Sequence, residues 1–345
     1  MSIETLFDKV DLGNGLTLNN RIVMAPLTRS KADDDLVPTA AMAAYYGRRA
    51  DAGLIISEAT IVAADGQGYP NTPGLFNAEQ VESWKQVTQR VHQNGGKMFA
   101  QLWHTGRVSH PIYQDGKAPM APSAIELHGR IPRFSDLEYG TPRAMTDADI
   151  ERVIEDFGRA AANAKLAGFD GVEIHGANGY LIDQFLHWHT NHRNDGYGGS
   201  PEKMSQFLFR IIERVSQEIT QVGLRLSPAA YIHVEHDARD KAVFDYLLEQ
   251  LNRYNLSYVH GGIFNDEPFD HLQGTITQYI RRHYRGTVIA SGGYDAESAS
   301  STVLGGDADL IAIGRPFIAN PDYVSKVRNQ QPPIPYEESM LAELI

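Results

Sequence analysis

The 345-residue chain contains no cysteine. This absence excludes disulfides, zinc sites with cysteine ligands, iron–sulfur clusters and thiol nucleophiles together. Basic residues are outnumbered by acidic ones. The chain has 31 Lys and Arg against 43 Asp and Glu, which gives a net charge of −12. Nucleic acids and anionic membranes bind basic surfaces, so we expect neither as a partner. Any phosphate that the protein binds must therefore be held by a local group of residues.

Long hydrophobic runs are missing as well. Residues 1–10 are mixed polar and acidic without the apolar core of a signal peptide, and no run approaches the length of a membrane span. We therefore expect a cytoplasmic protein. With 42% hydrophobic and 21% charged residues, the composition is typical of a globular protein with a large core. No low-complexity tract divides the chain, so a single domain over residues 1–345 is the simplest interpretation.

Short apolar, β-branched runs alternate along the chain with segments of helical periodicity. The runs predict eight strands, at 21–25, 54–57, 97–102, 171–175, 223–226, 258–260, 287–290 and 310–313. Helical spacing occurs in 39–50, 78–94, 147–167, 201–221 and 242–254. Such alternation implies parallel strands with right-handed crossovers, and eight units close into a (β/α)₈ TIM barrel. An open doubly wound sheet is the alternative.

Two segments fall outside this alternation. Asn14-Gly15 lies between apolar residues near the N-terminus, which predicts a β-hairpin capping the bottom of the barrel. The segment 104–146, after the third predicted strand, is rich in Pro, Gly and His and too long for an ordinary loop. Because it leaves from the C-terminal end of a strand, where barrel enzymes build active sites, we predict a capping insertion over the pocket.

Unusual residues crowd the C-terminal ends of the predicted strands, and the fourth end is the most informative. His175 and Asn178 are three positions apart at a strand-to-turn transition, so both side chains can donate hydrogen bonds to one carbonyl oxygen. This polarisation makes the conjugated β-carbon electrophilic. Tyr180 can donate a proton to the α-carbon after hydride has reached the β-carbon. The alternative is a core or metal-ligating histidine beside a packing tyrosine.

The last two predicted strands end in a candidate phosphate site. Ser291, Gly292 and Gly293 follow the seventh strand, and Gly314 and Arg315 follow the eighth. Exposed backbone N–H groups and an arginine bind phosphate at this position in many barrels. FMN and a sugar phosphate both suit such a site.

Arg225 ends the fifth predicted strand, and a buried arginine requires an anion. That anion is either the pyrimidine ring of a reduced flavin or one of the chain's carboxylates. Gln101 and Thr28 can hydrogen-bond a flavin, and Trp103 and Tyr69 can form apolar walls. Core packing alone explains each of these four equally well.

Three other readings of the site are weaker. His187, His189 and His192 lack the carboxylate or cysteine partners of a metal site, so we predict no metal. A non-redox aldolase or isomerase acting on phosphorylated substrates needs a lysine or a carboxylate pair at the strand ends, whereas Lys97 begins its strand. A noncatalytic flavin-binding protein has no use for a proton donor such as Tyr180.

With these residues assembled, the sequence resembles the Old Yellow Enzyme family of flavin-dependent NAD(P)H oxidoreductases over about residues 6–321. The resemblance is carried by residues 20–29 (NRIVMAPLTR), 54–60 (LIISEAT), 66–71 (GQGYPN), 101–107 (QLWHTGR), 175–180 (HGANGY), 197–200 (YGGS) and 314–316 (GRP). With threonine at position 28, the sequence resembles the branch of the family in which a hydroxyl group at this position tunes the flavin.

The resemblance implies noncovalent FMN, NADPH or NADH as reductant, and an activated alkene that is reduced in the same pocket. Such alkenes are α,β-unsaturated carbonyl compounds, maleimides or nitro compounds. It implies that His175 and Asn178 bind the substrate oxygen beside Tyr69 and Trp103, and that Tyr180 is the proton donor. The FMN would be lined by residues at the strand ends: Ala25, Pro26, Leu27, Thr28, Ala59, Gln101, His175, Arg225, Ser291, Gly292, Gly293, Gly314 and Arg315.

The chain departs from the family pattern at two places. Lys203-Met204 stands where many members have Asn-Arg, and the usual glycine-rich tail with its aromatic residue is replaced by residues 331–336 and a short acidic stretch. The family pattern therefore does not say how the exposed edge of the flavin is covered, and Tyr336 is one option that the sequence does not select. Monomer and homodimer are both compatible with the sequence.

Overall fold

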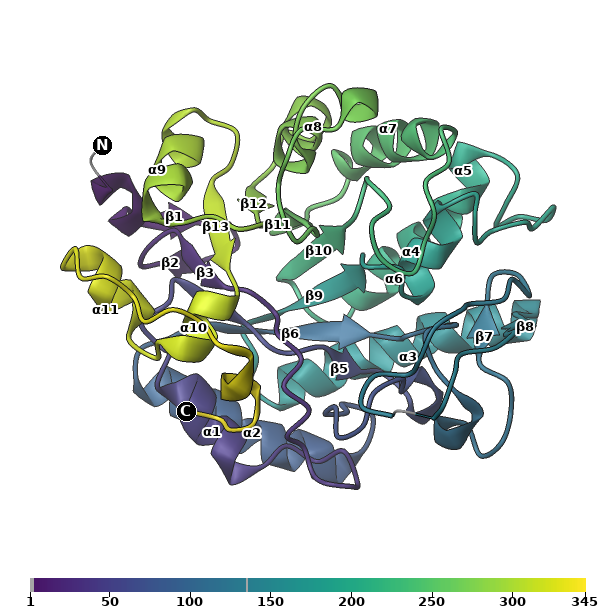
Figure 1. Ribbon diagram of the computed structural model, residues 1–345, viewed down its shortest axis with the longest axis horizontal. Helices are drawn as coiled ribbons and strands as arrows, with labels where there is room; N and C mark the ends of the chain where they lie inside the picture. Colours follow the sequence, from purple (N-terminus) through teal and green to yellow (C-terminus); the bar gives the residue numbers. More distant parts are fainter. Residues whose placement is uncertain (1–2, 135) are drawn as a thin grey trace.

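Eight parallel strands close into a barrel in the computed structural model, which describes residues 3–134 and 136–345 (Figure 1). Each strand pairs with the next, and β13 pairs with β3 to complete the circle. This confirms the predicted TIM barrel and rules out the open sheet. The barrel strands are β3 (Ile22–Met24), β4 (Leu54–Ile56), β6 (Met98–Trp103), β9 (Gly171–Gly176), β10 (Val222–Leu226), β11 (Tyr258–Gly261), β12 (Val288–Ala290) and β13 (Leu310–Ile313).

Helices surround the barrel, and several begin at caps that are visible in the sequence. Asn77 and Thr146, for example, accept hydrogen bonds from the backbone of Gln80 and Asp149. No helix of the described chain is long and apolar enough to cross a membrane. The helices are α1 (Ala40–Gly47), α2 (Ala78–Gln93), α3 (Asp147–Leu166), α4 (Leu181–Leu186), α5 (Pro201–Met204), α6 (Gln206–Ser216), α7 (Asp240–Leu251), α8 (Ile276–His283), α9 (Ala296–Leu304), α10 (Arg315–Ala319) and α11 (Tyr323–Arg328).

One helix differs from its prediction. The segment 201–221 forms α5 and α6 rather than a single helix, with the break at Ser205. The Ser205 hydroxyl donates to the carbonyl of Pro201 at 2.8 Å, so a side chain competes with the backbone for that acceptor.

The predicted hairpin consists of β1 (Val10–Asp11) and β2 (Thr17–Leu18), joined through Asn14 and Gly15. Both turn residues have positive φ, at 51° and 81°, as the tight turn requires. Gln221, which precedes β10, donates to the carbonyl of Gly13 at 2.7 Å. The hairpin therefore lies at the N-terminal ends of the strands, where its apolar side chains pack with the barrel interior: Val10, Leu12, Leu16 and Leu18 with Val23, Leu54, Ile56, Phe99, Tyr258, Ile289 and Leu310.

The segment 104–146 covers the opposite end of the barrel. Apolar residues of this cap (Val108, Leu127, Ile131, Tyr139) form a buried cluster that packs against Tyr69 and Tyr180. Arg107 is buried and donates to the carbonyls of Ile125 and His233, which ties the cap to the loop after β10. The remaining short elements are β5 (Thr60–Ile61), β7 (Met120–Ala121), β8 (Arg143–Ala144), and the 3₁₀ turns Glu4–Phe7, Ala64–Gly66, Pro111–Tyr113, Asp270–Leu272 and Glu338–Leu341.

Candidate active site

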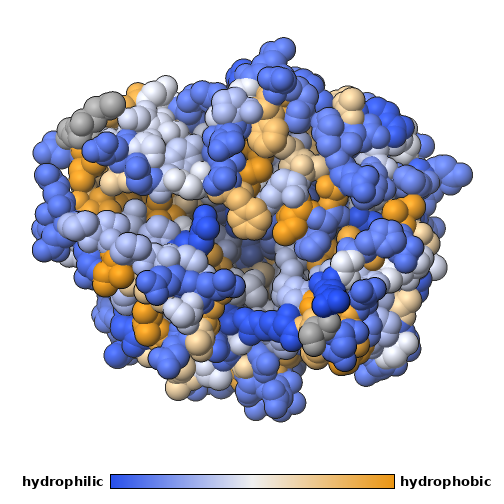
Figure 2. Space-filling view, viewed as in Figure 1, coloured by the Kyte–Doolittle hydropathy of each residue, from blue (hydrophilic) through white to orange (hydrophobic). Residues whose placement is uncertain are grey.

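A cavity of about 530 Å³ lies at the C-terminal ends of the barrel strands, and Figure 2 shows the hollow near the middle of that face. This volume is within the range of small-molecule and cofactor sites. The cavity brings together these residues of the predicted FMN site: Ala25, Pro26, Leu27, Arg225, Ser291, Gly292, Gly293, Gly314 and Arg315. Asn178 also lines it, with Tyr231, Ile263, Phe264, Tyr294, Ala312, Ile313, Pro316 and Tyr336.

One end of the cavity is suited to a phosphate group. Gly292 and Gly293 follow β12 with φ values of 120° and 86°, which a residue with a side chain rarely adopts. A Cβ atom at Gly292 would collide with the backbone nitrogen of Asp266. Arg315 is exposed at the start of α10 and forms no ion pair with any residue in the described ranges. The two loops therefore present bare backbone beside a free cation.

Arg225 supplies a second cation, which is buried. Its side chain lines the cavity at 8% exposure, and its Nε has no hydrogen-bond partner within residues 3–134 and 136–345. The carboxylate of Glu173 lies in the neighbouring strand but bonds Gln101 at 2.8 Å and His260 at 2.9 Å instead. The alternative of a salt bridge for Arg225 is therefore not realised among the described residues. A buried, unpaired cation that lines a cavity calls for an anionic ligand.

Beneath the cavity, Glu173 and His260 form a buried pair that the sequence analysis missed. Burial opposes the charge of Glu173, but His260, Arg225 and Gln101 together lower the pKa of its carboxyl. Glu173 could have been noticed as a charged residue inside the apolar run of β9. Its carboxylate accepts a hydrogen bond from the side-chain amide of Gln101 and so orients it.

Four aromatic rings pack together around Tyr180, in residues that are not among those lining the cavity. Trp103 lies edge-to-face against Tyr180, with 4.9 Å between ring centroids, and stacks on His175 at 6.4 Å. The hydroxyl groups of Tyr180 and Tyr69 are 2.8 Å apart. The predicted substrate residues His175, Tyr69 and Trp103 thus surround the predicted proton donor.

His175 and Tyr180, two of the three titratable groups in this cluster, are neutral at ordinary pH. Burial, then the positive charge of Arg225, holds the pKa of His175 well below its usual value. Burial and the neighbouring Tyr69 raise the pKa of Tyr180 well above its usual value. A neutral imidazole keeps one N–H donor, and a protonated phenol keeps a proton that it can donate. The Nδ1 atom of His175 has no partner in the described chain.

Asn178 and Gly179 form a left-handed turn between His175 and Tyr180, with φ values of 62° and 73°. A Cβ atom at Gly179 would collide with the carbonyl oxygen of Ile232, so only glycine fits this position. The N–H of Gly179 donates to Asp183 at 2.8 Å. The turn is thereby held in the shape that carries Asn178 to the cavity.

Four residues of the predicted FMN site do not line the cavity. Thr28 is exposed beside Leu27, Gln101 and His175 are buried, and Ala59 packs with Trp103. Conversely, Tyr231, Ile263, Phe264 and Tyr294 line the cavity although the sequence analysis did not select them. Each lies in the loop that follows a barrel strand, and the rule that such loops carry the site would have found them.

The three histidines that could suggest a metal have separate contacts. Ring nitrogens of His187 lie 3.1 Å from Asp183 and 2.8 Å from Asp240. His189 accepts a hydrogen bond from the backbone of Glu235, and the ring of His192 is exposed. No cluster of three or more His, Cys, Asp or Glu residues within the described ranges could hold a metal ion.

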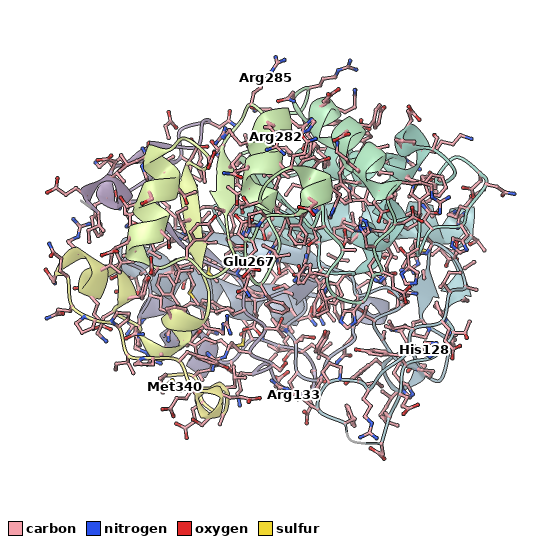
Figure 3. The ribbon with its side chains drawn as sticks, turned by 45° about the horizontal axis from the view of Figure 1, so that its top comes forward. His128, Arg133, Glu267, Arg282, Arg285 and Met340 are labelled. Carbon is pink, nitrogen blue, oxygen red and sulfur yellow. The ribbon has the colours of Figure 1, made fainter. Side chains whose placement is uncertain are left out.

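The C-terminal segment lies across the rim of the cavity. Tyr336 lines the cavity. The carbonyls of Met340 and Glu343 accept hydrogen bonds from Arg29, and those of Ala342 and Leu344 accept from Lys31 and Arg48. Figure 3 labels this segment at Met340, with Arg133 of the cap also in the lower part of the view.

The barrel, the loops suited to a phosphate and the buried cation are those expected of a flavin-dependent oxidoreductase, and comparison with known proteins shows this class. The sequence profile of the NADH:flavin oxidoreductase / NADH oxidase family matches residues 5–333. The chain therefore belongs to this family, that of Old Yellow Enzyme. It is an FMN-dependent NAD(P)H oxidoreductase that reduces activated alkenes.

Individual relatives are similar over nearly the whole chain. 12-oxophytodienoate reductase 1 of Oryza sativa subsp. japonica is 40% identical over 334 residues, 94% of this chain and 86% of its own. An old yellow enzyme homologue from Zymomonas mobilis superposes with a TM-score of 0.91 at 39% identity, covering 98% of this chain and 96% of its own. Morphinone reductase in complex with tetrahydroNAD gives 0.90 at 39% identity, covering 97% and 93%.

Proposed function

We propose that the cavity binds FMN and that Arg225, which has no ion-pair partner among the described residues, faces the flavin ring that becomes anionic on reduction. The unpaired, buried guanidinium is the observation that carries this assignment. Ser291, Gly292, Gly293, Gly314 and Arg315 would hold the phosphate. When bound, FMN supplies the hydride chemistry, by accepting hydride from NAD(P)H and passing it to an alkene.

His175 and Asn178 are proposed to bind the oxygen of the activating group. His175 is neutral and keeps one N–H, and the amide nitrogen of Asn178 can donate from the cavity wall. Both donors strengthen their hydrogen bonds as negative charge develops on the oxygen. They favour substrates with a carbonyl or nitro oxygen conjugated to the double bond.

Tyr180 is proposed to deliver the proton to the α-carbon. Its raised pKa keeps the phenol protonated, and the hydroxyl of Tyr69 at 2.8 Å can accept from or donate to it. A proton lost from Tyr180 can therefore be replaced through Tyr69.

The non-redox alternative finds no support in the cavity. An aldolase or isomerase of this fold needs a lysine or a pair of carboxylates at the reacting centre. The described lining of the cavity contains neither, since its only charged side chains are Arg225 and Arg315.

The roles of the two arginines are separable by experiment. We expect Arg225→Gln to weaken the binding of FMN and riboflavin alike, by roughly tenfold or more, because its partner is the ring. Arg315→Gln should weaken FMN binding but leave riboflavin binding unchanged, because its partner is the phosphate. Titration of the apoprotein by flavin fluorescence measures both. Unaltered FMN binding in Arg225→Gln, or an equal loss of both ligands in Arg315→Gln, would contradict the assignment.

Tyr180→Phe should slow turnover of weakly activated enones about a hundredfold, because general acids contribute on this order. The half-reaction with NADPH, in which no carbon is protonated, should keep its rate. Stopped-flow measurement of the two half-reactions separates these effects. Tyr139→Phe is the matched control, since this buried cap tyrosine has a hydroxyl without a partner in the described chain. Equal losses in both half-reactions would reject the proton-donor role.

A further inference from the structure

The side-chain oxygen of Asn178 is already engaged on the protein side. The Tyr231 hydroxyl lies 2.5 Å from Asn178 Oδ1, and the Ser227 hydroxyl lies 3.4 Å from the same atom. Tyr231 belongs to the loop after β10 and lines the same cavity as Asn178. The amide that would bind the substrate oxygen is therefore in contact with two hydroxyl groups.

Only one of these hydroxyls is available as a donor. The single hydrogen of Ser227 goes to the carbonyl of Gly262 at 2.7 Å. The Ser227 oxygen in turn accepts the backbone N–H of Asn178 at 3.1 Å. Tyr231 is thus the group that donates to Oδ1, and with that oxygen engaged we infer that the amide nitrogen of Asn178 is the group left to face the cavity.

Tyr231 is itself held in place. Its ring packs edge-to-face against Phe264, with centroids 5.4 Å apart at 86°. Burial raises the pKa of Tyr231 to about 12, so the hydroxyl retains its proton at neutral pH. Phe264 is 63% exposed on the loop after β11, and it supports the ring from the mouth of the cavity.

We propose that Tyr231 is a positioning residue that fixes the orientation of the Asn178 amide and so makes the site selective for hydrogen-bond acceptors. This inference rests on the proposed function, in which Asn178 binds the substrate oxygen. Without the Tyr231 hydroxyl, the amide is free to rotate by 180° and present its carbonyl instead. The wild-type site would present two fixed donors, His175 and Asn178. Without the Tyr231 hydroxyl, only His175 would be a fixed donor, because the Asn178 amide could present either its nitrogen or its oxygen.

The test compares an acceptor ligand with a donor ligand of the same shape. A para-substituted phenol, which binds through its oxygen, and the corresponding aniline are titrated into the FMN-loaded protein by calorimetry. We expect Tyr231→Phe to weaken phenol binding roughly tenfold while aniline binding is unchanged or stronger. A purely structural loss would weaken both ligands equally and would overturn the proposal.

A double-mutant cycle shows whether Tyr231 acts through Asn178. In the Asn178→Ala background, Tyr231→Phe should change phenol affinity by less than about twofold, because the amide it orients is gone. Independent, multiplicative effects of the two substitutions would overturn the inference. Tyr284→Phe, a buried tyrosine outside the cavity, is the control, and thermal melts verify that each variant is folded.

Failure of the proposed function has a different signature. If the wild-type protein binds no phenol, or if Asn178→Ala binds it unchanged, then Asn178 is not the oxygen-binding residue and the proposed function itself is wrong. If Asn178→Ala weakens binding but Tyr231→Phe does not, only the role of Tyr231 is wrong.

Discussion

A variant with both His175→Ala and Asn178→Ala should reduce enones about a thousandfold more slowly than the wild type. Each side chain donates to the oxygen on which negative charge develops, and removal of one such donor usually costs about 10²–10³ in rate. The two losses are not expected to multiply, because both donors serve one oxygen. Single-turnover reaction of the reduced protein with an enone measures the rate, and phenol titration measures the loss of binding.

The variant changes His175, one of the residues predicted to line the FMN, so its flavin content is measured first and rates are compared per bound flavin. Arg225, Ser291 and Arg315 are untouched, so the cation and the loops proposed to hold the flavin are retained. His175→Asn is the matched control, because an asparagine retains an N–H donor and should recover part of the rate. Phenol affinity that does not change in the double variant would reject the assignment of both residues.

The second large effect concerns stability. His187→Leu should lower the free energy of unfolding by about 3–5 kcal/mol, because it leaves Asp183 and Asp240 buried without a cation. His187 lies between these two carboxylates, within 3.1 Å of each. His189→Leu is the matched control, since that half-buried ring lacks such a pair and should cost far less. Urea unfolding measures both variants, and equal losses would contradict the prediction.

The same cluster makes stability depend on pH in a defined direction. Burial opposes the charge of His187, but Asp183 and Asp240 raise its pKa to about 10. Because the folded pKa exceeds the ordinary value of about 6.5, the stabilisation is complete below pH 6.5 and is lost as the pH rises toward 10. The free energy of unfolding of the wild type should fall over this range, and His187→Leu should remove that part of the slope.

This cluster also connects stability to the active site. Asp183 bonds His187 through one oxygen and accepts the N–H of Gly179 through the other. Loss of His187 should therefore loosen the turn that carries Asn178 and Tyr180, and phenol affinity should decrease along with stability.

The barrel could be predicted from the sequence because its signals are local. Each strand is a short apolar run, and the candidate residues follow those runs directly, as His175 and Arg225 do. The break between α5 and α6 could not be predicted from the sequence, since it coincides with a hydrogen bond from the Ser205 hydroxyl to the backbone carbonyl of Pro201. Hydrophobic periodicity does not reveal such a side-chain hydrogen bond.

The contacts that orient the site are long-range and lay beyond sequence reasoning. Tyr231 is 53 positions from Asn178, and His260 is 87 positions from Glu173. The sequence identified Arg225 as a candidate. It did not show whether Arg225 pairs with a carboxylate, because that depends on the hydrogen bonds of Glu173 to Gln101 and His260. Residue types at strand ends thus indicate the chemistry, whereas the geometry requires the fold.

The C-terminal segment has a consequence for how this enzyme can diverge. Arg29, Lys31 and Arg48 hold the segment by main-chain carbonyls, which every amino acid possesses. Its amino-acid sequence can therefore drift while its attachment persists, provided that the three cations are kept together with Leu344, which packs against the core. Selection on this part of the cavity is then concentrated on Tyr336, the one side chain of the segment that lines it among the described residues. A single substitution there can alter the shape of the rim without disturbing the fold.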